Sequence, residues 1–192
     1  LPQAQAIINR MGFNNLGVEH LLEQVQVADT NSKIGINIGK NFDTPVGKAL
    51  DDYLLGLNKV YAHADYVTIN ISSPNTPGLR SLQFGKALDE LLDGLKNSQA
   101  DLAAKQERYV PMAVKVAPDL TTEELLQLAD TFGRFQVDAV IATNTTLDRD
   151  AVSGLKHAEQ AGGLSGRPLF ARSTEVVRQF RQALPADIPI IA

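Results

Sequence analysis

The 192-residue sequence contains no cysteine, and this absence excludes two kinds of site at once. Neither disulfide bonds nor cysteine-ligated metal centres can form without a thiol. The three histidines, His20, His63 and His157, are far apart and show none of the spacings typical of metal ligands. We therefore expect no metal site, and we look for chemistry carried by other side chains.

Long hydrophobic runs are also absent. No apolar stretch approaches the roughly 20 residues that a membrane-spanning helix needs. The first residues lack the charged and apolar regions of a signal peptide. We expect the chain by itself to be soluble and most simply cytosolic.

Runs of positive charge are missing as well. The 18 lysines and arginines are outnumbered by 22 acidic residues, which gives a formal charge of −4. No basic cluster is long enough to follow a phosphate backbone, so nucleic acid is not an expected partner. The 44% hydrophobic and 21% charged composition is that of an ordinary globular domain, or of part of one.

What the sequence does contain is a regular alternation of strand and helix patterns. Apolar, β-branched runs predict strands, and apolar residues at i, i+3, i+4 and i+7 predict amphipathic helices. Thr121 and Glu124 form a capping-box pattern that predicts the start of one helix. The predicted strands are 33–39, 65–71, 110–118, 137–143 and 188–192, and the predicted helices are 18–28, 46–57, 88–95, 121–132 and 168–184.

Three segments fall outside this alternation. Residues 9–15 (NRMGFNN) read as a polar loop, and residues 97–108 read as a polar surface segment. Residues 145–167 form a long, glycine-rich connection, and such connections inside compact α/β domains are usually functional or mobile. We hypothesise that 145–166 is a lid over a substrate.

Strands that alternate with helices of this length indicate parallel βαβ units, and two architectures are built from them. An open doubly wound sheet would show a Gly-x-Gly-x-x-Gly turn directly after a strand, and no such turn is present. Instead, four strands end in Asn37, Asn70, Lys115 and Asn144. Functional residues at the carboxyl ends of several strands are typical of the (β/α)8 TIM barrel. We predict an α/β fold in which residues 1–192 are an incomplete central portion of one barrel domain, with amino- and carboxyl-terminal portions missing.

The polar stretch after the second predicted strand reads DYVTINISSPNTPGLR (65–80). Asn70, Ser73 and Asn75 supply hydrogen-bond donors and acceptors without charge, which suits the edge of a lactam or imide ring. The sequence here is also typical of a plain turn, because Ser, Pro, Asn and Gly favour turns for backbone reasons. Both interpretations stay open on this stretch alone.

Lys115 lies among apolar neighbours and has two possible chemical roles. A buried lysine can act as a Schiff-base nucleophile, or it can stay charged and face a developing anion. It could also simply point to solvent. A Schiff-base aldolase needs ionisable partners to move protons, whereas the other strand ends offer asparagines, so the charged role is favoured.

Six motifs together closely resemble the class 2, quinone-dependent dihydroorotate dehydrogenases. The resemblance runs in order over essentially the whole chain. The motifs are NRMGFNN (9–15), GINIGKN (35–41), VTINISSPNTPGLR (67–80), VKVAPDL (114–120), IATNTT (141–146) and GGLSGRPL (162–169).

This resemblance implies an FMN-dependent barrel enzyme that oxidises dihydroorotate to orotate in pyrimidine synthesis and passes the electrons to a quinone. It makes Ser73 the catalytic base that removes the proton from C5 of dihydroorotate. The sister class has cysteine at this position, and this chain has no cysteine. Lys115 would lie near the flavin edge on which reduction places negative charge.

The resemblance also implies the remaining site residues. Substrate would be bound by Asn9, Arg10, Met11, Gly12, Phe13, Asn70, Asn75, Asn144 and Thr145. FMN would be bound by Asn37, Asn70, Lys115, Thr143 and Gly166.

Parts of the family pattern are not found in this sequence. They are the amino-terminal segment that forms the quinone entrance, an early lysine-bearing FMN loop, and the loops that hold the FMN phosphate. We therefore expect the quinone and the cytoplasmic face of the cell membrane to be peripheral partners of the longer parent only. The alternatives are another FMN-dependent pyrimidine oxidoreductase, such as a class 1 or dihydropyrimidine dehydrogenase, an inactive fragment, or a Schiff-base aldolase that uses Lys115.

Overall fold

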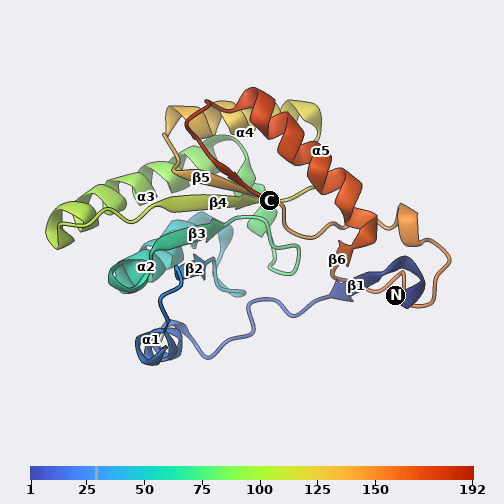
Figure 1. The fold of residues 1–192 in the computed structure, drawn as a ribbon, viewed down its shortest axis with the longest axis horizontal. Coiled ribbons are helices and arrows are strands. Elements are labelled where there is room, and N and C mark those ends of the chain that lie inside the picture. The colour runs from blue at the N-terminus through green and yellow to red at the C-terminus, as the bar shows by residue number, and fades with distance from the viewer. Residues whose placement is uncertain (29) are drawn as a thin grey trace.

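A five-stranded parallel sheet forms the centre of the computed structural model, which describes residues 1–28 and 30–192 (Figure 1). The strands lie in the order β2-β3-β4-β5-β7, so within this sheet the spatial order follows the order in the sequence. This sequential parallel order confirms the predicted portion of a (β/α)8 barrel. The strands are β2 (Gly35–Ile38), β3 (Tyr66–Asn70), β4 (Met112–Val116), β5 (Ala139–Ala142) and β7 (Ile190–Ile191).

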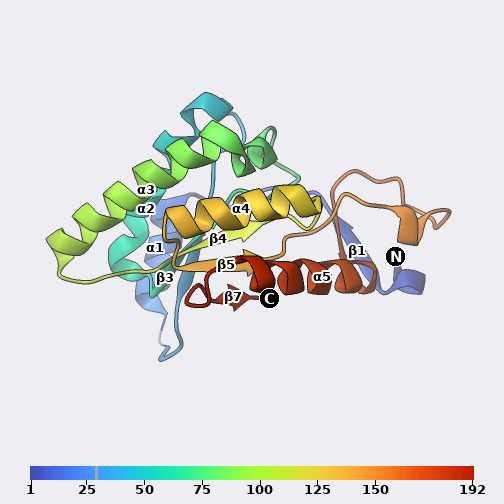
Figure 2. The same cartoon turned by 90° about the horizontal axis from the view of Figure 1, so that it is seen from above.

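Helices connect these strands and pack against one side of the sheet (Figure 2). The α-helices are α1 (Val18–Val27), α2 (Ala49–Val60), α3 (Gly85–Gln106), α4 (Thr122–Arg134) and α5 (Arg167–Ala183). Short 3₁₀ helices are Pro2–Ala4, Val46–Lys48, Tyr61–His63, Leu79–Gln83 and Asp150–Val152. None of the helices in the described part of the chain is long and apolar enough to cross a membrane.

Alternation along the strands separates a core face from a polar face. Successive residues of a strand point to opposite sides of the sheet. Ile69 and Val114 are fully buried in the core with the helices, so Asn70 and Lys115, their neighbours in sequence, face the opposite side. This second face lines the interior of a barrel, where a barrel enzyme places its site near the carboxyl ends of the strands.

Helix α3 corrects one prediction. Residues 97–108 were expected to form a polar surface segment, but the helix continues to Gln106, and Glu107 ends it in the left-handed conformation. Leu102 and Gln99 are buried on its inner face, and the Gln99 side chain donates hydrogen bonds to the Val110 carbonyl and to Asp138, each at 2.9 Å. The segment therefore has one packed face despite its polar composition. The capping box predicted for α4 is confirmed, because Thr121 and Glu124 bond each other's backbone N–H groups.

A second sheet was not predicted. β1 (Ala6–Asn9) and β6 (Gly163–Gly166) form an antiparallel pair in which Asn9 lies opposite Gly163. The loop prediction for residue 9 and the structureless connection predicted for 145–167 are both wrong over these strands. Figure 1 shows the pair beyond the ends of the parallel strands, on the side that carries the predicted site.

Candidate active site

Asn70 and Lys115 are direct neighbours on the interior face. They are register partners at the ends of β3 and β4. Lys115 is half-buried, and burial lowers the pKa of its ammonium group; no charged group in the described chain adds to this shift. The Asn70 backbone is fixed by the buried Tyr53 hydroxyl, which donates to the Asn70 carbonyl at 2.7 Å. Desolvation of the same phenol raises its pKa, so Tyr53 stays a neutral donor.

Ser72 joins the ends of β3 and β5. Its backbone N–H and its hydroxyl both donate to the Asn70 side-chain oxygen, each at 3.1 Å. The same hydroxyl accepts a hydrogen bond from the Asn144 amide at 3.0 Å. Asn144 is itself held to the sheet, because its backbone N–H donates to the Val116 carbonyl at 2.9 Å. Two of the predicted substrate asparagines are therefore oriented by one buried serine that was not predicted.

Ser73 lies at the next position, in a loop that reaches the antiparallel pair. It is 8% exposed, and its Oγ accepts a hydrogen bond from the Asn75 backbone N–H at 3.3 Å. The Asn75 side chain donates to the Asn9 carbonyl at 3.2 Å and to the Asn9 side-chain oxygen at 3.5 Å. The structure thus brings together residues 66 positions apart in sequence.

Thr145 extends the network toward β6. The Asn144 side-chain oxygen accepts from the Thr145 N–H at 2.7 Å and from its hydroxyl at 3.3 Å. A Cβ on Gly163 would lie 1.9 Å from the Thr145 hydroxyl oxygen, and one on Gly162 would lie 2.2 Å from the Asn9 carbonyl oxygen. Neither position has room for a side chain, because Gly162 lies against the Asn9 backbone and Gly163 lies against the Thr145 side chain.

Other predicted residues lie farther from this network. Gly166 is paired with Ala6 at the opposite end of β6, and the side chains of Arg10 and Met11 are exposed. The Arg10 guanidinium donates to the Gln160 side chain at 3.0 Å. The hydrogen bonds of the described chain do not connect these three residues to the asparagines.

The remaining predicted residues lie at the margins of the interior face. Asn37 is exposed near the end of β2, and the Thr143 hydroxyl donates to the Asn144 carbonyl at 2.9 Å. The Phe13 ring packs on Gly39, where a Cβ would lie 3.0 Å from the ring, and Gly12 precedes it in the left-handed region with φ 65°.

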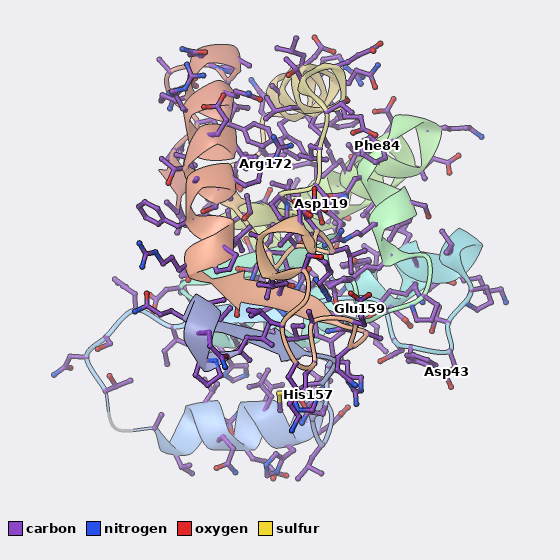
Figure 3. All side chains as sticks on the ribbon, turned by 90° about the vertical axis from the view of Figure 1, so that its right-hand side faces the viewer. Asp43, Phe84, Asp119, His157, Glu159 and Arg172 are labelled. Atoms are coloured by element: carbon purple, nitrogen blue, oxygen red, sulfur yellow. The ribbon has the colours of Figure 1, made fainter. Side chains whose placement is uncertain are left out.

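Two charged residues at the strand ends were also missed. Arg80 and Asp119 form an ion pair at 2.7 Å, with side chains 20% and 27% exposed. Figure 3 views the molecule from the side of β1 and β6 and shows Asp119 near the centre. Opposite charges after two consecutive strands, in motifs already singled out, were the signal that could have found this pair.

The residues present fit a flat, polar cofactor better than a metal ion. Within residues 1–28 and 30–192, no three acidic or histidine side chains cluster as metal ligands do. The interior face instead offers neutral amides beside the half-buried cation of Lys115. An environment of this kind can hydrogen-bond a heterocycle and stabilise negative charge that develops on it.

The family model and the similar curated proteins carry the same name, dihydroorotate dehydrogenase. The family model described as dihydroorotate dehydrogenase matches residues 1–192. A curated protein of Photorhabdus laumondii named dihydroorotate dehydrogenase (quinone) is 60% identical over 191 residues. Proteins of Escherichia coli and Vibrio parahaemolyticus with the same name are 59% identical. The chain spans 57% of the length of each of these relatives.

Solved structures agree with this match. The ligand-free dihydroorotate dehydrogenase of Eimeria tenella superposes with a TM-score of 0.89 at 36% identity, over 100% of this chain and 58% of that one. The complex of the Eimeria tenella enzyme with ferulenol gives a TM-score of 0.88 at 34% identity, over 98% and 55% of the two chains.

Proposed function

Since the chain belongs to the dihydroorotate dehydrogenase family, we propose that the protein oxidises dihydroorotate to orotate in pyrimidine biosynthesis, with FMN as hydride acceptor and a quinone as final electron acceptor. The observation that carries this proposal is the uncharged amide network around Ser72 at the carboxyl ends of β3 and β5.

Four asparagines are proposed to recognise the substrate. Asn70 and Asn144 are oriented by Ser72, and Asn75 is tied to Asn9. Each side-chain amide offers both donors and acceptors, so together they match the alternating N–H and C=O groups of a pyrimidine ring. The backbone of residues 10–13 and Thr145 complete the proposed substrate site.

Ser73 is the proposed base. Oxidation removes a proton from C5 of dihydroorotate and a hydride from C6, and a double bond forms between these two carbons. The hydroxyl of Ser73 is buried, and it accepts a hydrogen bond from the Asn75 backbone N–H. This bond favours the deprotonated, negatively charged form of the serine. A serine hydroxyl is a weak base, and exclusion of water from the site helps it to accept the proton.

The proposed FMN residues are Asn37, Asn70, Lys115 and Thr143, on the interior face and its margins, and Gly166, which lies apart from them at the far end of β6. When bound, FMN supplies the hydride acceptor for C6. Lys115 contributes a half-buried cation, which would stabilise negative charge placed on a neighbouring ring. A protein as long as the curated relatives is proposed to use a quinone as electron acceptor. It is also proposed to contact the cytoplasmic face of the cell membrane peripherally.

Residues 145–166 are proposed to cover the bound substrate. The segment begins at Thr145, which bonds Asn144, and it folds back on itself, because Thr146 and Leu164 exchange backbone hydrogen bonds at 2.8 and 3.0 Å. Amide hydrogen exchange in 145–166 should slow when orotate is added. Exchange that orotate does not change would contradict this role.

A comparison of two serines between β3 and α3 tests the function. The protein, expressed at the length of its relatives, should form orotate from dihydroorotate with a soluble quinone. Ser73→Ala should lower kcat by about 10²–10⁴-fold, the usual contribution of a positioned base. Ser81→Ala is the matched control, because its exposed hydroxyl bonds only the Gly78 carbonyl, at 2.6 Å. No orotate from the unsubstituted protein, or an undiminished rate in Ser73→Ala, would refute the proposal.

A further inference from the structure

Arg80 connects the ends of three strands. Its Nε donates to the Ser72 carbonyl at 3.1 Å, in the loop after β3. One terminal nitrogen donates to the Thr145 carbonyl at 2.9 Å, in the segment after β5. The other donates to Asp119, after β4, at 2.7 Å. A single guanidinium therefore holds the segments after β3 and β5, which carry Asn75 and Asn144.

Asp119 extends this connection to the antiparallel pair. Its carboxylate accepts from the Leu147 N–H at 3.0 Å and from the Thr146 hydroxyl. Thr146 in turn forms an antiparallel bridge with Leu164 of β6. Since β6 pairs with β1, the links run from Arg80 to the strand that ends in Asn9.

We propose that Arg80, held by Asp119, is a positioning residue for this reaction, which fixes the Ser72–Ser73 loop relative to Asn144 and Thr145. This inference rests on the proposed function and assigns no contact with substrate to Arg80. The planar fork of an arginine can donate in three directions at once, whereas a lysine ammonium is a compact point charge. Arg80→Lys therefore keeps a positive charge beside Asp119 while it loses the bridge between the two carbonyls.

A comparison with a surface arginine separates positioning from simple ion pairing. Arg134 pairs with Asp89 at 2.9 Å and with Asp130 at 3.3 Å, but its side chain is 51% exposed against 20% for Arg80. Exposed pairs of that kind contribute little to stability. Arg134→Lys is thus the matched control for the same chemical change.

The experiment uses the flavin-loaded protein at the length of its relatives and has two readouts. The first is amide hydrogen exchange of residues 144–147 without substrate, which should be about tenfold faster in Arg80→Lys, the factor expected when hydrogen bonds to a charged donor are lost. The second is the dissociation constant of orotate, which should rise by about tenfold or more for the same reason. Arg134→Lys should change neither.

Each outcome decides the question. Faster exchange with unchanged orotate affinity would reduce Arg80 to a structural role and overturn the proposal. Unchanged exchange would overturn it as well, whatever the affinity. If the unsubstituted protein does not bind orotate, the proposed function fails, and the exchange readout alone still decides whether Arg80 joins the two loops.

Asp119→Asn provides a second variant if Arg80→Lys does not fold. It retains the Arg80 guanidinium but weakens its anchor, so both readouts should move in the same direction by smaller factors. The effects of the two substitutions should also combine less than additively, because both act through one hydrogen-bonded unit. Full additivity of the two effects would contradict a shared role.

Discussion

At the scale of single residues, Lys115 is where stability and function oppose each other. Its ammonium is half-buried and its pKa is lowered by desolvation, so the charged form is less favourable in the folded protein than in the unfolded chain. A lowered lysine pKa means that stability is lost as pH falls through the folded-state pKa and is regained toward the ordinary value of 10.5.

Lys115→Met should therefore raise the stability of the flavin-free protein at pH 7 while it weakens flavin binding. Denaturant unfolding from pH 7 to 11 should show the difference between variant and wild type shrinking as pH approaches 10.5. The raised pKa values of Tyr53 and Tyr109 act alike in both proteins and cancel in this difference. Lys105→Met, at an exposed position, is the control. A flavin-free variant less stable than wild type would contradict the argument.

The two adjacent serines should have separable roles. Ser72→Ala removes a hydroxyl that orients both Asn70 and Asn144 and leaves the Asn144 amide without that acceptor. We predict that orotate affinity falls about tenfold, the equivalent of one lost hydrogen bond in a buried network. Ser73→Ala should instead lower the rate and leave orotate affinity nearly unchanged. Titration of both variants with orotate checks the split, which equal losses of affinity would contradict.

Single-residue reasoning from the sequence found the side chains with distinctive chemistry but not those that orient them. Asn70, Lys115 and Asn144 follow apolar strands, where polar groups are conspicuous. Ser72 and Arg80 do not stand out from their neighbours in the sequence, because a serine in a turn and an arginine in a loop are common. Their roles depend on distances between strands that are not adjacent in sequence.

At the scale of elements, the antiparallel pair β1–β6 brings the chain's first residues to the site. The close approach of Gly163 to Thr145 leaves no room for a side chain, since a Cβ would lie 1.9 Å from the hydroxyl oxygen and 3.2 Å from the Pro74 ring. Gly163→Ala should lower the free energy of unfolding by about 1–3 kcal/mol, as overpacking usually does. It should also weaken orotate binding.

Gly47→Ala is the matched control for this substitution. A Cβ at Gly47 would have no heavy atom within 4 Å, and the residue does not lie in the left-handed region. Thermal unfolding and orotate titration of both variants test the prediction. Equal stability and equal affinity in the two variants would show that the contact with Thr145 carries no weight.

The elements differ in how far sequence could predict them. The β3 and β4 strands are apolar and β-branched, so their local pattern is strong. Strand β6 reads GLSG and pairs with a strand about 157 positions earlier, so neither local propensity nor proximity indicated it. The second half of α3 reads in the sequence as a polar surface segment because its buried face includes Gln99, whose polar side chain is hydrogen-bonded to Val110 and Asp138.

At the scale of the whole molecule, the two ends of the sheet have different roles. The carboxyl ends hold the asparagine network, whereas the amino ends hold structural bonds such as that from the Met112 N–H to Asp138 at 2.8 Å. This division is the usual one in barrels, and it is the reason that polar residues at the strand ends, such as Asn70 and Lys115, predict the candidate site from the sequence. The paths of the loops that meet there depend on long-range packing, so their contacts required the structure.

The most direct test of the central claim is the visible spectrum of the protein, expressed at the length of its relatives, before and after anaerobic addition of dihydroorotate. We expect a flavin band that bleaches when dihydroorotate is mixed in, as the bound flavin is reduced. In Ser73→Ala the band should be present but should persist. Absence of a flavin band, or a band that dihydroorotate does not bleach in the unsubstituted protein, would contradict the assignment of this site to dihydroorotate oxidation.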